Sequence, residues 1–177
     1  MMLKKGMVQV YSGEGKGKTT AAFGLALRAA GNGFKVAIFQ FLKAKGNKTG
    51  ELALAKKFKN VKIFRNDQTH PMFNKNIKMA DLKHNAELLF ALVKKTVFSG
   101  EYDLVVLDEI NNCMFGGLIE KDEVLSLIKQ KPLHVEMVLT GRSVPEEIVK
   151  ASDLVTEMKM IKHPYEKGVS ARKGIEY

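Results

Sequence analysis

A glycine- and lysine-rich segment, residues 12–20 (SGEGKGKTT), separates a strand-like run from a helical one. The apolar run 7–11 predicts a strand, and small and apolar residues at helical spacing predict a helix over 18–30. A strand, a glycine-rich turn and a helix that opens on Lys-Thr is the context of a Walker A phosphate loop. This feature restricts the chain to α/β folds in which a helix N-terminus points at a bound polyphosphate.

The residues of this loop match the chemistry of phosphate binding. Its three glycines allow backbone N–H groups to turn inward, Lys18 supplies a positive charge, and the Thr19 hydroxyl is a ligand for Mg²⁺. The generic motif has glycine where this chain has Ser12, and the alternative interpretation is a Gly/Lys-rich surface turn. The flanking strand and helix favour a phosphate site made of Ser12, Gly13, Glu14, Gly15, Lys16, Gly17, Lys18, Thr19 and Thr20.

Strand-like and helical patterns alternate along the rest of the chain. Further strands are predicted over residues 35–41, 61–64, 103–110, 134–140 and 154–161, and further helices over 52–58, 79–97, 122–128 and 145–151. Residues 65–78 have no clear period and are interpreted as a long loop. The alternation predicts an α/β fold with a mainly parallel sheet and helices on both faces, in a single domain over residues 1–177. Ligands of such sheets bind at the carboxyl ends of the strands.

A second acidic motif ends the predicted strand 103–110, where four apolar residues precede Asp108 and Glu109. Two carboxylates at this place are typical of a Walker B site, which holds Mg²⁺ directly or through water. Neighbouring strand residues point to opposite faces, so we expect only one of the two to face the metal. The alternative is a pair of ordinary strand-end charges. Together the two motifs predict a Mg·nucleoside triphosphate site, which kinases, ATPases and group transferases share.

Charge and composition restrict the kinds of ligand or partner and the cell compartment that we expect for this chain. The formal net charge is +10, and the first 78 residues hold 16 basic and 3 acidic side chains, so the excess lies in this part of the chain. This favours an anionic ligand or partner there and excludes a uniformly basic coat. The single cysteine, Cys113, excludes a disulfide framework and a cysteine-based zinc ribbon, and we interpret it as a small buried hydrophobe. No apolar run predicts a signal peptide or membrane span, so we expect a cytoplasmic protein.

Several further segments, taken with the phosphate loop, resemble one family in order along nearly the whole chain. The similarity is to the P-loop type ATP:corrinoid adenosyltransferases, in which Ser or Thr is usual at the position of Ser12. The segments that carry it are SGEGKGKTTAA (12–22), LRAAG (27–31), QFLK (40–43), LDEIN (107–111), LTGR (139–142), DLVTEM (153–158), KHPY (162–165) and KGIEY (173–177).

This resemblance implies a RecA-like fold, usually a homodimer, and a specific reaction. The 5′-deoxyadenosyl group of ATP passes to the Co(I) centre of a reduced corrinoid, and inorganic triphosphate is released. Because Co(I) is the nucleophile, the protein's work is positioning and electrostatics. It implies that Lys18, Lys16 and Glu109 are the catalytic residues, and that Mg²⁺ is held by Thr19 and by Glu109 or Asp108.

Other positions follow less directly from the same resemblance. Arg28, Gln40 and Lys43 are candidate ATP-binding residues, and Arg142 is similar to them in its place after a predicted strand. Members of the family carry an aromatic pair that includes tryptophan beside the corrinoid's lower face, whereas this chain has no tryptophan. Phe73, with Met72 beside it, is the nearest candidate for corrinoid binding.

Three other classes of function remain open at this point. A P-loop phosphotransferase or hydrolase would share the same motifs, and so would a nucleic-acid-stimulated ATPase that uses the basic part of the chain. A nucleotide-binding carrier without turnover is the third. If the family resemblance holds, nucleic acid becomes an unlikely partner. The surplus of basic residues over 35–78 would then dock an acidic electron donor such as a reduced flavodoxin.

Overall fold

The computed structural model describes residues 3–43, 49–55, 57–66 and 78–176. Its strands are β1 (Val8–Ser12), β2 (Val36–Gln40), β3 (Val61–Arg65), β4 (Leu104–Asp108), β5 (Glu136–Thr140) and β6 (Leu154–Glu157). Its helices are α1 (Lys18–Gly31), α2 (Gly50–Ala55), α3 (Met79–Phe98), α4 (Ile110–Phe115), α5 (Lys121–Gln130) and α6 (Glu146–Ala151), followed by the short 3₁₀ helix η1 (Pro164–Lys167). None of the helices in these ranges is both long and apolar enough to cross a membrane.

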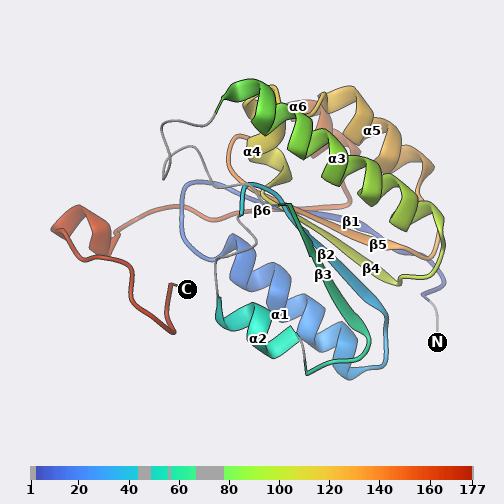
Figure 1. Ribbon diagram of the computed structural model, residues 1–177, viewed down its shortest axis with the longest axis horizontal. Helices are drawn as coiled ribbons and strands as arrows, with labels where there is room; N and C mark the ends of the chain where they lie inside the picture. The colour runs from blue at the N-terminus through green and yellow to red at the C-terminus, as the bar shows by residue number, and fades with distance from the viewer. Residues whose placement is uncertain (1–2, 44–48, 56, 67–77, 177) are drawn as a thin grey trace.

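The six strands form one parallel sheet in the order β3-β2-β4-β5-β1-β6. Helices α1 and α2 cover one face and α3, α4, α5 and α6 the other (Figure 1). The predicted α/β class with helices on both faces is therefore confirmed. Strand β5 lies between β1, which leads into the phosphate loop, and β4, which ends in the acidic pair, an arrangement consistent with a RecA-like P-loop domain.

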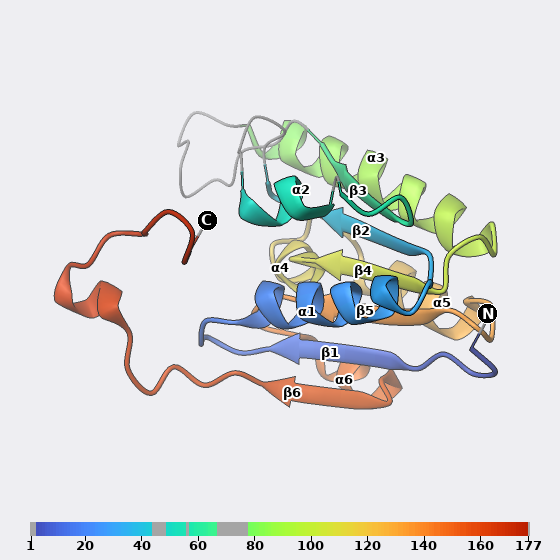
Figure 2. The same ribbon diagram turned by 90° about the horizontal axis from the view of Figure 1, so that it is seen from below.

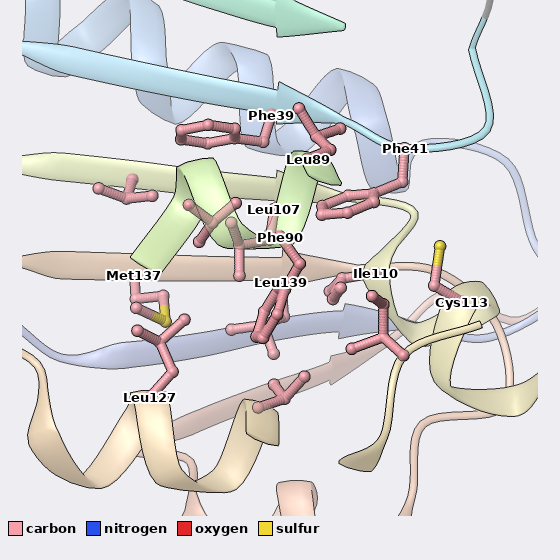
Figure 3. Close-up of a cluster of buried hydrophobic side chains, with 14 of the residues drawn as sticks. Phe39, Phe41, Leu89, Phe90, Leu107, Ile110, Cys113, Leu127, Met137 and Leu139 are labelled. Atoms are coloured by element: carbon pink, nitrogen blue, oxygen red, sulfur yellow. The ribbon is translucent and has the colours of Figure 1, made fainter. Parts of the chain in front are cut away.

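Two apolar layers hold the sheet between its helices. On one face four alanines of α1 pack against residues such as Ile38 and Val106, and their small side chains let the helix lie close to the sheet. On the other face large side chains of β2, β4 and β5 meet α3 and α5 (Figure 3). Cys113 lies at the edge of this cluster and is buried, and burial raises the pKa of its thiol. This environment agrees with its predicted role as a small hydrophobe.

The structure differs from the predicted elements mainly at strand ends. The strand expected over 103–110 ends at Asp108, because Glu109 has a left-handed backbone (φ 69°) and α4 begins at Ile110. Helix α4 and η1 are both short and were not anticipated from periodicity. The strand expected over 154–161 ends at Glu157, and Figure 2 shows it at the open edge of the sheet. Met72 and Phe73 lie outside the described residues.

Candidate nucleotide-binding site

The carboxyl ends of β1, β4 and β5 and the N-terminus of α1 surround a cavity of about 750 Å³. Residues 14–20 of the phosphate loop form one wall, and Lys43, Glu109 and Arg142 reach it from β2, β4 and β5. The end of the chain, at Ile175 and Glu176, forms part of the rim. The parallel sheet thus brings together loops that are far apart in sequence, at the edge where ligands of such sheets bind.

The phosphate loop is held by the chain that follows β6. Gly15 N–H donates to Met158 O at 2.6 Å, and Met158 N–H donates to Ser12 O at 2.8 Å. A Cβ atom on Gly15 would lie 2.7 Å from Met158 O, and one on Gly13 would lie 2.5 Å from the same oxygen. Glycine is required at both positions because the backbone of the segment after β6 approaches them closely, and at Gly13 also because φ is +99°.

Substituting Gly15 tests this close approach. Gly15→Ala is expected to lower the free energy of unfolding by about 1–3 kcal/mol, because the new methyl group meets backbone atoms that cannot move independently. Gly24→Ala is the matched control, since Gly24 lies in α1 with no atom within 4 Å of an added Cβ. That change should be neutral or stabilising by up to about 1 kcal/mol. Urea unfolding of both variants measures the difference, and equal stabilities would contradict the assignment.

Lys18 begins α1 and turns back into its own loop. Its ammonium donates to Gly13 O at 2.6 Å and to Gly15 O at 2.8 Å. Burial lowers the pKa of Lys18, and the charge of Glu109 only partly offsets this effect. The helix N-cap is Gly17, which has no side chain to cap the first N–H groups of α1. These groups and the ammonium together are suited to binding an anion.

Asp108 is fully buried and receives hydrogen bonds at both carboxylate oxygens. Thr19 Oγ1 donates to Oδ1 at 2.8 Å and Thr140 Oγ1 to the same atom at 2.7 Å. Gln40 Nε2 and Lys43 Nζ donate to Oδ2 at 2.9 and 2.8 Å. Burial alone would raise the pKa of Asp108, but the charge and hydrogen bond of Lys43, with the other donors, hold it below its ordinary value. The charged Asp108 carboxylate at the end of β4 therefore holds together the ends of β2 and β5 and the start of α1.

Glu109 is the member of the acidic pair that lines the cavity. Its left-handed backbone directs the chain from β4 into α4, and its N–H donates to Thr140 Oγ1 at 3.0 Å. Burial and the charge of Asp108 raise the pKa of Glu109. Among the described residues, the cavity lining includes Glu109 and Thr19 but not Asp108. A carboxylate and a hydroxyl beside a phosphate site are oxygen donors suited to Mg²⁺, which takes its remaining ligands from phosphate and water.

An ion pair forms the boundary between this cavity and a second one. Arg142 Nη1 lies 2.9 Å from Glu14 Oε2, and the Arg142 N–H donates to Asn112 Oδ1 at 2.6 Å. These three residues line both cavities. The second cavity, of about 380 Å³, is otherwise largely apolar, with walls from Leu42, Met79, Leu82, Phe115 and Leu118. The side chain of Phe115 is prominent here, because the residue is 75% exposed.

Of the other predicted site residues, the structure brings some to the cavity and not others. Lys43 lines it, while Gln40 is buried behind it and accepts a hydrogen bond from Arg65 Nε at 2.6 Å. Arg28 is exposed in the last turn of α1, at the end of the helix remote from the loop, and does not line the cavity. Thr140 and Asn112 were not predicted. Thr140 could have been proposed, since it ends a buried strand immediately before Gly141 and Arg142.

The fold and the site together define a P-loop nucleotide-binding protein of the RecA-like type. The model of the family described as ATP:corrinoid adenosyltransferase BtuR/CobO/CobP matches residues 4–177, and the chain belongs to this family.

Individual relatives agree with this assignment. The protein named corrinoid adenosyltransferase from Pseudomonas aeruginosa is 34% identical over 174 residues, which cover 98% of this chain and 85% of the relative. One with the same name from Sinorhizobium sp is 35% identical over 176 residues, 98% of this chain and 81% of its own length. The Escherichia coli (strain K12) protein of that name is 29% identical over 174 residues, 98% of this chain and 87% of its own length.

Proposed function

We propose that this protein transfers the 5′-deoxyadenosyl group of ATP to the Co(I) centre of a reduced corrinoid and releases triphosphate. Family membership supports this activity, and the observation that carries it is the pair of adjoining cavities. The cavity at the phosphate loop suits the triphosphate. The largely apolar cavity on the other side of the Glu14–Arg142 pair suits a face of the corrin macrocycle.

The electron balance of this reaction explains why the site needs no general base. The electron pair of Co(I) forms the cobalt–carbon bond to the ribose C5′, and the C5′–O bond breaks. The bonding electrons leave with the triphosphate, on whose oxygens negative charge grows. Lys18, Lys16 and the loop N–H groups would stabilise that charge because they are fixed around its position. Mg²⁺, held by Thr19 and Glu109, would neutralise part of it.

Several properties of the working protein belong to the same proposal. We infer a single domain, a homodimer and a cytoplasmic location.

We also propose that an acidic flavoprotein supplies the electrons that reduce the corrinoid. Lys35, Lys57 and Lys59 lie near the amino ends of β2 and β3, opposite the cavity, whereas the exposed Lys78 is the N-cap of α3 on the cavity side. Within the basic surplus of residues 35–78, we propose that the donor docks on the cavity side, near Lys78. Reduction rates that do not change with salt would contradict this docking.

The phosphorus-containing product separates this function from its rivals. With Mg·ATP and reduced corrinoid, phosphorus NMR is expected to show inorganic triphosphate in equal amount to the alkylated corrinoid. A phosphotransferase would give ADP, a hydrolase would give phosphate without corrinoid, and a carrier would give neither. Hydrolysis stimulated by single-stranded DNA would instead support a nucleic-acid-dependent ATPase.

A further inference from the structure

The segment that follows β6 leaves the body of the protein and then returns to the phosphate loop. Figures 1 and 2 show residues after Glu157 running outward through η1 and the end of the chain turning back. Every residue from 159 to 176 except His163 is exposed, so little of this segment packs on the sheet or its helices. A capping box joins His163 to Glu166, and Gly168 has a left-handed backbone (φ 73°), which together build the turn.

The returning segment places a carboxylate between two cations at the rim of the cavity. Glu176 Oε1 accepts from Lys16 Nζ at 2.8 Å and from Arg172 Nη2 at 3.1 Å. Glu176 Oε2 accepts from Arg172 Nε at 3.3 Å and from the Arg172 backbone N–H at 2.7 Å. These hydrogen bonds from Arg172 and Lys16 lower the pKa of Glu176 to about 2, so the group is an anion at any physiological pH.

This arrangement has the chemistry of an occupied phosphate site. A guanidinium that meets two oxygens of one anion, beside an ammonium of the phosphate loop, is a typical binding mode for a carboxylate or a phosphate group. Lys16 belongs to the loop that faces the cavity, and Gly174, Ile175 and Glu176 line the same cavity. A triphosphate bound there would therefore compete with the Glu176 carboxylate for the Lys16 ammonium.

Replacing the Glu176 carboxylate by a polyphosphate at Lys16 and Arg172 would cost the fold little free energy. The side chains of Lys16 and Arg172 are 45% and 58% exposed, and ion pairs at such positions contribute little to stability. A polyphosphate carries more negative charge than a single carboxylate, so it would displace Glu176 from both cations. Because the tail is otherwise exposed, moving Glu176 would leave the sheet and its helices unchanged.

We propose that Arg172 is a triphosphate-binding residue, and that the Glu176 carboxylate occupies its site and that of Lys16 until the nucleotide arrives. The proposal rests on the proposed function, since it assumes that the cavity takes a triphosphate. It adds a cation from the C-terminal segment to those of the phosphate loop. It also makes Glu176 an internal competitor of both ATP and the released triphosphate.

Inorganic triphosphate is the probe that tests this pair without any corrinoid. Isothermal titration calorimetry with Mg²⁺ present gives its Kd for the wild type, Arg172→Gln and Glu176→Gln. Arg172→Gln is expected to weaken binding about 5- to 10-fold, because a charge-assisted contact is lost. Glu176→Gln is expected to tighten binding about 2- to 5-fold, because the competing anion is removed.

Two variants with the same changes of charge serve as controls. Lys167→Gln removes a positive charge from the same segment, and Glu101→Gln removes an exposed negative charge elsewhere, so neither should change Kd by more than about 2-fold. If the wild type binds triphosphate and Arg172→Gln binds it with the same Kd, the proposal is overturned. The same holds if Glu176→Gln does not bind triphosphate more tightly than the wild type. Either result would leave the proposed function intact. Failure of the wild type to bind triphosphate at all would count against the proposed function itself.

Discussion

Replacing Lys18 by alanine is expected to lower kcat/KM for adenosyl transfer by about 10²- to 10³-fold while the protein stays folded. The Lys18 ammonium is held at the centre of the phosphate loop by Gly13 O and Gly15 O, 2.6 and 2.8 Å away. A triphosphate in the cavity would replace these carbonyl oxygens as its partner, and negative charge on that leaving group is greatest in the transition state. Single-turnover transfer with reduced corrinoid measures the loss.

The fold should tolerate this change because alanine is the best helix former at the start of α1. Far-ultraviolet circular dichroism and urea unfolding check that the variant remains native. Lys129→Ala, in the last turn of α5 and remote from the cavity, is the control and should retain wild-type transfer. Transfer within about 3-fold of wild type in Lys18→Ala would show that this loop is not the triphosphate site.

The two acidic residues at the end of β4 are expected to give opposite results. Asp108→Ala should lower the free energy of unfolding by about 3 kcal/mol, because it leaves the partly buried charge of Lys43 without its fully buried partner. It also leaves Gln40 and Thr140 without an acceptor.

Glu109→Gln should keep or slightly raise the free energy of unfolding, since burial and the charge of Asp108 already disfavour the charged form of Glu109. Glu109→Gln should instead lower the rate of adenosyl transfer by about 10²-fold.

Urea unfolding and transfer assays on both variants separate the two roles. Asp122→Ala is the control for stability, because this carboxylate lies exposed in the first turn of α5. If Asp108→Ala unfolded at the same urea concentration as wild type, the hydrogen bonds to Asp108 would not stabilise the fold as predicted. If Glu109→Gln transferred at the wild-type rate, Glu109 would not act on the leaving group or its metal.

The order of strands and helices could be predicted from sequence because it depends on local periodicity. In β4, residues 104–107 are all apolar because the strand is covered on both faces. Residues 12–20 combine a glycine-rich turn with a lysine and two threonines, a pattern that few structures other than a phosphate loop require. Arg28 could also have been judged from local geometry. It stands ten residues after Lys18, about 15 Å along a helix, so a place outside the wall of the cavity is what helix geometry predicts, and its role in ATP binding stays a prediction.

The contacts that complete the site could not be predicted in this way. Lys43 binds a carboxylate 65 residues away, and Lys16 binds one 160 residues away. Such pairs depend on the order of strands in the sheet and on the course of an exposed tail. Strand alternation implies that only one of the two acidic residues faces the cavity, but which one does so depends on the left-handed backbone of Glu109. Local patterns carry no information on either point.

The most direct test of the central claim is an anaerobic transfer assay followed by visible spectroscopy. Protein, Mg·ATP and chemically reduced cobalamin are mixed, and the spectrum is recorded before and after exposure to light. We expect the bands of an alkylated corrinoid, which light converts back to an unalkylated form, and one triphosphate for each cobalt–carbon bond. If no light-sensitive species forms with cobalamin or with its earlier corrinoid precursors, the proposed adenosyl transfer is wrong.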